Sequence, residues 1–253
     1  MAKIAARNAR ILFDNRNLSP DVNNAVLSIT AEAPEATGFC DTYRVRLNNS
    51  IRDYEFTCDG FYNDAASTMD EVLSAALAGS GLAAIYFRGL GSSNMGREFN
   101  SILTSYEQTY AVADAAAVSF TLSGSSTLYH MQSLSGSNLG VCGAPYVKGV
   151  GSSTFASVDT GATPAATDSY VSVRVIGASG TTPTFSASIE YSDDDATFTT
   201  VASVIDVTPA DINANSASMW HVTAASRYRR AIVSLGGTNP CAIFVIASGS
   251  LVA

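Results

Sequence analysis

The sequence predicts a mainly β protein with one helix: a β-sandwich or barrel domain, followed by a second β-sandwich of jelly-roll or immunoglobulin-like type. Three observations lead to this prediction. Residues 53–59 alternate strictly between apolar and polar side chains, as in a strand with one buried face. Residues 68–78 are the only segment with a convincing helical pattern. After residue 168, short alternating segments are separated by turn residues, which is typical of a sandwich.

Two strands are expected before the alternating segment, at residues 9–13 and 22–31. In the second of them, Val22, Val26 and Ile29 are expected to point into the core. Apolar and alternating runs after the helix predict further strands in the same domain. These lie at residues 82–87, 97–110 and 115–122.

The predicted helix at residues 68–78 begins with a capping box from Thr68 to Glu71, whose hydroxyl and carboxylate satisfy free backbone N–H groups. Gly79 is a natural C-terminal stop. Five residues at helical spacing form one apolar stripe that is expected to pack on the sheet. The stripe consists of Met69, Val72, Leu73, Ala76 and Leu77.

Composition divides the chain into three parts. Residues 1–134 make up the first domain, with the helix inside it. Residues 135–167 are rich in Gly, Ser, Thr and Pro and are expected to be a linker. Residues 168–253 make up the second domain. We therefore expect the second domain to fold alone.

The second domain carries a tight acidic turn and a basic cluster. Residues 193–195 are three consecutive aspartates, which suit a solvated hairpin turn better than a calcium site because the EF-hand spacing and its terminal Glu are missing. Alternation puts Arg227 and Arg229 on one face of a strand and Arg230 on the other. These arginines are expected to pair with the acidic turn or to lie on the surface. The expected surface residues of this domain are Asp193, Asp194, Arg227 and Arg229.

Charge argues against a protein that grips nucleic acid. The chain has 253 residues, a net charge of −8 and a sequence pI of about 4.6. Affinity for nucleic acid is driven by neutralising phosphates with cations, so this protein should repel DNA. Only 14% of residues are charged, and small uncharged side chains suit repeated burial between protein subunits.

The sequence also argues against membrane insertion and secretion. No apolar run approaches the roughly 20 residues that a bilayer requires. The first residues lack the apolar core of a signal peptide and form a short basic arm. A location in the cytoplasm until assembly or lysis is therefore expected.

No catalytic, metal or cofactor site is predicted. The four cysteines, Cys40, Cys58, Cys142 and Cys241, form no CxxC pair and are expected to be buried thiols, although a bridge between the first two is conceivable. His130 and His221 have no GxSxG nucleophile motif to serve, so structural roles are expected for both. We therefore expect a protein that is not an enzyme and uses no cofactor.

The layout of the chain resembles the tail tube, or major tail, protein of long-tailed bacteriophages, in its actinophage-like form with an extra C-terminal β-sandwich domain. The order of strands, long loop and single helix carries the resemblance. So do several short stretches of sequence. These are residues 37–42, 60–64 and 104–107 in the first domain, and residues 191–194, Phe198 and residues 227–230 in the second.

The resemblance implies a structural subunit. Six copies would form a ring around a shared inner barrel, and rings would stack into a tube through which DNA passes without specific binding. The partners would be further copies of the chain and other virion tail proteins, with no membrane, and the location would be the virion tail. The alternative function is a carbohydrate-binding or adhesive module on the virion surface, which the second domain alone suggests.

The resemblance also suggests roles for two groups of charged residues. The long loop at residues 35–52 would contact the adjacent ring, and its arginines point to an acidic partner surface. The acidic side of the strand at residues 53–59 would face the lumen or the outer surface, with the strand at residues 97–110 and its acids Glu98 and Glu107 as a competing lumen strand. The candidate loop residues are Asp41, Arg44, Arg46 and Arg52, and the candidate lumen residues are Asp53, Glu55 and Asp59.

Overall fold

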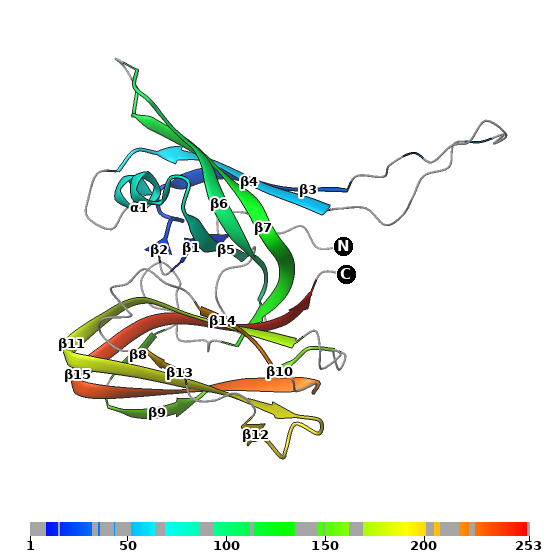
Figure 1. Cartoon of the computed structure of the whole chain (residues 1–253). Helices are drawn as coiled ribbons and strands as arrows, with labels where there is room; N and C mark the ends of the chain where they lie inside the picture. The colour runs from blue at the N-terminus through cyan, green and yellow to red at the C-terminus, as the bar shows by residue number, and fades with distance from the viewer. Residues whose placement is uncertain are drawn as a thin grey trace.

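The computed structural model shows a mainly β chain, as predicted, in which the described strands form one hydrogen-bonded network with the order β12-β11-β15-β7-β6-β5-β1-β2 and side branches. Every named strand pair in it is antiparallel. The network has two halves (Figure 1). The structure describes residues 9–14, 16–31, 35, 43, 52–63, 69–86, 94–111, 114–134, 146–148, 150–161, 169–200, 205–207, 218–222 and 226–251.

The first half contains the one helix of the described residues and a strongly bent sheet. The helix lies against one side of the sheet, and the hairpin β3–β4 projects away from the body of the molecule (Figure 1). Its elements are β1 (Arg10–Phe13), β2 (Arg16–Asn17), β3 (Val22–Ala31), β4 (Arg52–Phe61), α1 (Met69–Ala76), β5 (Ser80–Tyr86), β6 (Met95–Thr109) and β7 (Ala117–Ser133).

Strand β4 has the two faces that its sequence predicts. Tyr54, Phe56 and Cys58 are buried, whereas the aspartates and the glutamate between them are exposed. The buried side packs on α1, β1 and β5 in a single cluster. Burial raises the pKa of the Cys58 thiol, which is free. Cys241 is free and partly buried, and Cys40 and Cys142 lie outside the described residues.

Strand β3 is more exposed than predicted. Val26 and Ile29 are about half exposed, at 50% and 49%, so their predicted inward positions are wrong. Among the described strands β3 pairs only with β4, which makes it an edge strand. Val26 lies opposite Thr57, on the polar side of the sheet. Only Val22 and Leu27 of this strand contact the core, both partly buried.

The helix buries a narrower stripe than its sequence predicts. Met69 and Leu73 are fully buried, but Leu77 follows the last helical residue and is 53% exposed, so its predicted burial is wrong. The left-handed residue that ends the helix is Ala78, with φ of 63°, rather than Gly79. The N–H of Gly79 still donates to the carbonyl of Ala76 at 2.7 Å and closes the last turn. Thr68 of the predicted capping box lies outside the described residues.

The second half is built from one long two-stranded ribbon that folds back on itself. Strands β11 (Ser169–Ser192) and β15 (Tyr228–Leu251) pair along their whole length, and both bend at the same point, at the left of Figure 1. Gly180 and Thr182 in β11, and Gly237 and Asn239 in β15, have positive φ at this bend. The sequence predicts turns between separate strands in this region. In the structure these residues form a corner within the continuous strands β11 and β15.

The folded ribbon encloses a second core. Val171, Val173 and Val175 come from one arm of β11, and Phe185 and Ile189 come from the other. Short strands add to the ribbon. They are β8 (Tyr146–Lys148), β9 (Gly151–Thr154) and β10 (Val158–Asp159) on β15, and β12 (Thr199–Thr200), β13 (Ile205–Val207) and β14 (Ser218–His221) on β11. Three of these strands come from residues 135–167, so this segment contributes to the second half.

The two halves meet where β7 pairs with the end of β15. The ladder runs from the pair Ser133–Ala247 to the pair Tyr129–Leu251. Gly249 allows the close approach, because a Cβ there would lie 1.7 Å from the carbonyl oxygen of His130. A third apolar cluster spans this junction and draws residues from both halves: Leu12, Ala84, Tyr86, Tyr129, Met131, Val245 and Ala247.

A buried ion pair also joins the halves. Arg174 of β11 donates through Nη2 to Oε2 of Glu98 of β6 at 3.1 Å, and both side chains have no exposed area. Nη1 of Arg174 donates to the carbonyl oxygens of Asp14 and Leu82 at 2.6 and 2.8 Å. The junction therefore contains polar groups that only the other half can satisfy.

Candidate functional site

One face of the sheet β3–β4–β7–β6 is polar and uncovered by any other described element. Directly paired residues in antiparallel strands project to the same side, so the register identifies the members of this face. Glu55 lies between Ser28 of β3 and Ser123 of β7, and Asp59 lies between Asn24 and Ser119 in the same way. Four strands thus contribute to one continuous polar face.

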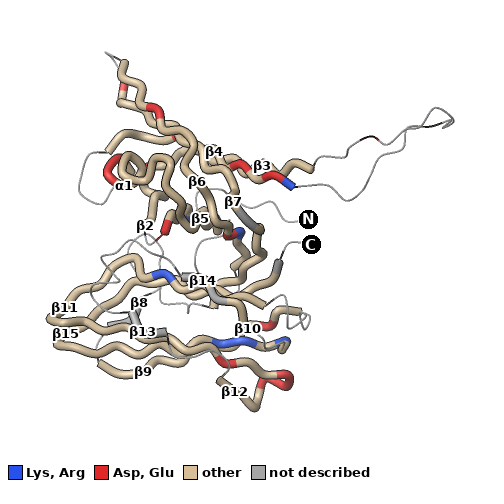
Figure 2. Tube along the Cα trace, viewed as in Figure 1, with Lys and Arg blue, Asp and Glu red and all other residues tan. Residues whose placement is uncertain are grey.

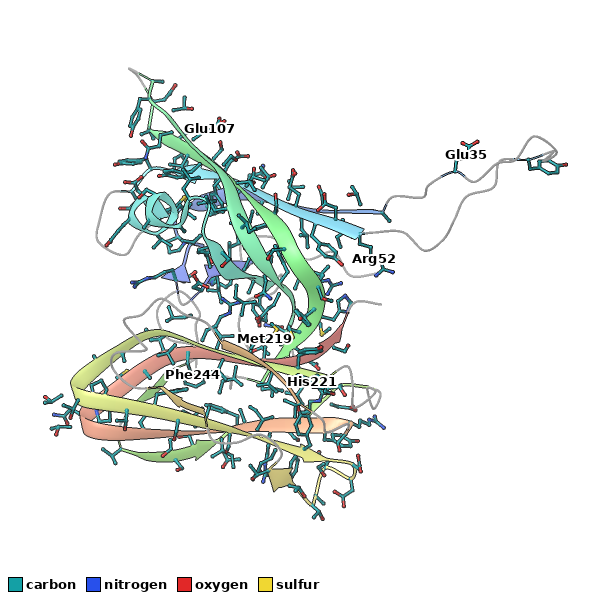
Figure 3. The ribbon with its side chains drawn as sticks, viewed as in Figure 1. Glu35, Arg52, Glu107, Met219, His221 and Phe244 are labelled. Carbon is teal, nitrogen blue, oxygen red and sulfur yellow. The ribbon has the colours of Figure 1, made fainter. Side chains whose placement is uncertain are left out.

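Four carboxylates lie on this polar face. Asp53, Glu55 and Asp59 are exposed on β4, and Figure 2 shows the acids along this strand. Glu107 of β6 is exposed and pairs with Ser119, which itself pairs with Asp59. Two strand spacings therefore separate Glu107 from Asp59, a distance of about 10 Å. Figure 3 labels Glu107 on the part of β6 that lies across β4.

Most of the other residues of this face are Ser or Thr, joined by Asn24 and by the apolar residues Val26, Phe61, Ile102 and Ala117. Asn24 donates its side-chain amide to Oδ2 of Asp59 at 2.9 Å, across the β3–β4 pair. Thr104, at a register shift in β6, contacts Oγ of Ser123 at 3.3 Å. No Lys or Arg is among the described residues of the face, which consists of Asn24, Val26, Ser28, Thr30, Asp53, Glu55, Thr57, Asp59, Phe61, Ile102, Thr104, Ser105, Glu107, Thr109, Ala117, Ser119, Thr121 and Ser123.

The sequence offered β4 and β6 as alternative lumen strands. In the structure, both strands contribute to the same face. The acids of β4 and Glu107 share one face, because β7 pairs with β4 on one side and with β6 on the other. Glu98 is different, because it is fully buried in the ion pair with Arg174. Of the two acids predicted on β6, Glu107 is thus exposed, whereas Glu98 is buried and has a structural role.

The candidate loop residues are described only in part. Arg52 is the first residue of β4 and is exposed at the far end of the hairpin, as Figure 3 shows. Because successive side chains of a strand project to opposite faces, Arg52 lies on the side opposite Asp53. Asp41, Arg44 and Arg46 lie outside the described residues.

The acidic turn of the second half is exposed and closed by its own hydrogen bonds. Oδ1 of Asp194 accepts from the N–H groups of Ala196 and Thr197, at 2.9 and 2.8 Å, and from the hydroxyl of Ser192 at 2.8 Å. These donors, led by the Thr197 N–H, lower the pKa of Asp194 to about 2. Across the described ranges, no cluster of three His, Cys, Asp or Glu residues could hold a metal ion.

The arginine cluster agrees with the prediction in part, because Arg227 is exposed. Arg227 forms a two-bond pair with Asp159, and Arg230 pairs with Glu190 at 2.7 Å and lies 3.8 Å from the Phe198 ring centre. Neither interaction involves the acidic turn. Arg229 is only 1% exposed, so its predicted surface position is wrong. Its strand neighbour Ala231 is also buried, which shows that this side of β15 faces inward.

The two histidines have different surroundings. His130 is half-buried on β7, and burial followed by the charge of Arg97 lowers its pKa. The His221 ring packs on Tyr170 with ring centres 5.1 Å apart. None of the described helices is long and apolar enough to cross a bilayer.

Sequence reasoning missed the contribution of β7 to the polar face. The run from Ala117 to Ser123 alternates small or hydroxyl residues with Val118, Phe120 and Leu122, which are buried. This alternation marks one polar side, as it does in residues 53–59. The signal was present, but pairing β7 with β4 depends on contacts that a single sequence does not specify.

Comparisons with known proteins give structural neighbours only. No protein-family model matches, and no curated protein matches. A chain from the virion of a native gene transfer agent particle is 14% identical, with a TM-score of 0.44, and the match covers 51% of this chain and 98% of that one. The SPP1 tail tube is 10% identical with a TM-score of 0.41, over 48% and 76%. The SPP1 Dit protein, a hub of the adsorption apparatus in phages of Gram-positive hosts, is 11% identical with a TM-score of 0.36, over 95% and 98%.

Proposed function

We propose that the chain is a structural subunit of a phage tail tube, in which hexameric rings stack into a conduit for DNA. The observation that supports it best is the uncovered face of β3–β4–β7–β6, which carries Asp53, Glu55, Asp59 and Glu107 and has no described Lys or Arg. In this proposal the face lines the lumen. The protein acts in the virion tail and is held in the host cytoplasm before assembly.

The chemistry of this face suits the passage of DNA. Each cation that contacts a phosphate adds salt-dependent affinity, which would slow a sliding duplex. Carboxylates repel the phosphates instead, and the other described side chains of the face are uncharged, most of them Ser or Thr. The duplex therefore passes without specific binding, and the protein needs neither a catalytic site nor a cofactor for this role.

The edge strand β3 supports self-association. Its outer edge has no pairing partner among the described strands, and it carries the half-exposed apolar residues Val26 and Ile29. Such an edge is a template for pairing with another chain unless it is protected. A head-to-tail contact of this kind closes into a ring when the rotation per subunit allows it. Other copies of the chain are therefore the first partners, followed by other tail proteins.

Electron microscopy of the purified full-length protein tests this proposal. We expect rings or tubes with a central channel. Deleting residues 44–49 should leave a folded protein that no longer stacks, because the arginines of this loop are proposed to contact the adjacent ring. Circular dichroism and a thermal melt check that the deletion variant is folded.

Two outcomes would count against these assignments. Monodisperse monomers of the wild-type protein at high concentration would favour the adhesive or carbohydrate-binding alternative. Unchanged tubes from the deletion variant would show that residues 44–49 make no essential contact between rings.

Charge reversal on the polar face should slow DNA ejection. Particles carrying Glu55→Lys with Asp59→Lys should assemble but eject DNA several-fold more slowly, because the new cations bind passing phosphates. Ejection can be timed with a DNA-binding dye, and the delay should shrink as salt is raised.

The matched control for this experiment is Asp193→Lys, compared with Glu55→Lys alone. Both make the same change in charge at an exposed residue, but Asp193 lies in the turn of the second half. Normal ejection by the Glu55→Lys particles, or an equal delay in both variants, would place the acids of β4 outside the lumen.

A further inference from the structure

A pocket of about 300 Å³ lies at the junction of the two halves. Met95, His130 and Gln132 line it from the first half, and Arg229, Ser248 and Ser250 line it from the second. The pocket exists only because β7 and β15 pair, since His130 lies opposite Ser250 and Gln132 lies opposite Ser248 in that ladder. Its described lining residues include no carboxylate.

Arg229 is a buried cation without an acidic partner among the described residues. Its side chain is 1% exposed, and Nη1 donates to the hydroxyl of Ser248. Nε has no hydrogen-bond partner within the described part of the chain. The guanidinium lies 5.1 Å from the ring centre of Tyr191. Burial lowers the pKa of Arg229, and no carboxylate opposes that shift.

One further basic group lines the pocket, and another pairs with it. His130 lines the pocket, and Arg97 pairs with His130 across β6 and β7. Arg97 lowers the pKa of His130, which shows that the two side chains are electrostatically close. The carboxylate next to the pocket residue Thr160 is Asp159, which is already held by two hydrogen bonds from Arg227.

This concentration of basic groups is unusual in a chain of net charge −8. An isolated buried charge is costly unless it is paired and hydrogen-bonded. The other buried guanidinium, Arg174, has Glu98 as its partner. Arg229 is therefore about as buried as Arg174, but it has no carboxylate partner among the described residues. It lines a pocket in which an anion would lie close to it.

We propose that this pocket binds a small oxyanion, either a phosphate or sulfate group or a carboxylate. Arg229 supplies a guanidinium charge at the pocket wall, and arginine is the side chain that proteins most often use to bind such groups. Ser248, Ser250 and Gln132 provide neutral donors on the same side of the β7–β15 ladder. Because residues of both halves line the pocket, the bound anion fastens the halves together. This site is independent of the tail-tube proposal.

Thermal unfolding of the full-length protein tests the proposal. Sodium phosphate, sulfate and acetate are each titrated at pH 7 against sodium chloride of equal ionic strength. We expect a concentration-dependent rise in Tm beyond the chloride control, because a ligand that binds only the folded state stabilises it. A response to phosphate and sulfate identifies a tetrahedral group, and a response to acetate identifies a carboxylate.

Variants separate this site from general salt effects. Arg229→Met should weaken the apparent affinity by about tenfold or more, in line with the loss of a charged hydrogen bond. Arg230→Met is the matched control, because it removes the neighbouring arginine, whose partner Glu190 is not among the described lining residues, and it should keep the full response. His130→Gln should weaken the affinity less and provides a second variant if Arg229→Met does not fold.

Two results would overturn the proposal. One is a wild-type Tm that follows ionic strength alone in all three salts. The other is an equal anion response in wild type, Arg229→Met and His130→Gln.

Discussion

Replacing Glu98 with alanine is expected to lower the free energy of unfolding by about 3–5 kcal/mol, because the change leaves a buried guanidinium without its counterion. Arg174 and Glu98 have no exposed side-chain area and are joined at 3.1 Å. The loss should show as a lower midpoint in urea, followed by tryptophan fluorescence or circular dichroism.

The expected cost of this change includes other bonds to Glu98. Oε1 accepts from the hydroxyl of Ser172 at 2.9 Å and from the phenol of Tyr86. Burial and the neighbouring Glu98 carboxylate raise the pKa of Tyr86 well above its usual value, so its phenol remains a donor. Removing the carboxylate leaves three buried donors without their acceptor.

A double variant distinguishes a broken ion pair from simple loss of packing. Glu98→Met with Arg174→Met should recover much of the stability, since apolar residues of similar volume often replace a buried pair without loss. Asp159→Ala removes a partner of the exposed arginine Arg227 and should hardly move the midpoint. A small loss in Glu98→Ala, equal to that in Asp159→Ala, would contradict the structural role assigned to the buried pair.

Leu73→Ala is expected to cost about 2–5 kcal/mol, because it opens a cavity in the first core. Leu73 is fully buried and belongs to the cluster that includes Phe56 of β4 and Leu103 of β6. The reduction should be visible as a lower Tm or urea midpoint of the full-length protein.

Leu77→Ala is the matched control, since it removes the same atoms from a residue that is 53% exposed. We expect a change within about 0.5 kcal/mol, as for most surface substitutions. Equal losses in the two leucine variants would mean that Leu77 is also buried, for example by a neighbouring subunit.

Local pattern predicted the elements of the first half well. The bounds of the strand at residues 22–31 and the two faces of residues 53–59 are confirmed, because both depend on chain geometry within one element. The inward positions of Val26 and Ile29 were wrong because burial depends on what covers a strand. The division of the chain into independent domains stays a prediction.

The sequence alone could not predict which distant strands pair or pack together. Glu98 looked like a surface acid until β6 was placed against β11, and Arg229 looked like a surface cation until the inward side of β15 was known. Charged residues are usually exposed, so a buried one can be identified only from its surroundings. The same reason explains why the polar face emerged only when β4, β7 and β6 were joined.

The central position of β15 has a consequence for how the protein folds. This strand pairs with β7, β8, β9, β10 and β11, yet it is the last of the described strands in chain order. Most of its contacts are therefore distant in sequence, and pairings of this kind form slowly because a long loop must close first. Until β15 has been synthesised, the parts of β7 and β11 that pair with it lack that partner. The second core and the junction between the two halves therefore close only after residues 228–251 have been translated.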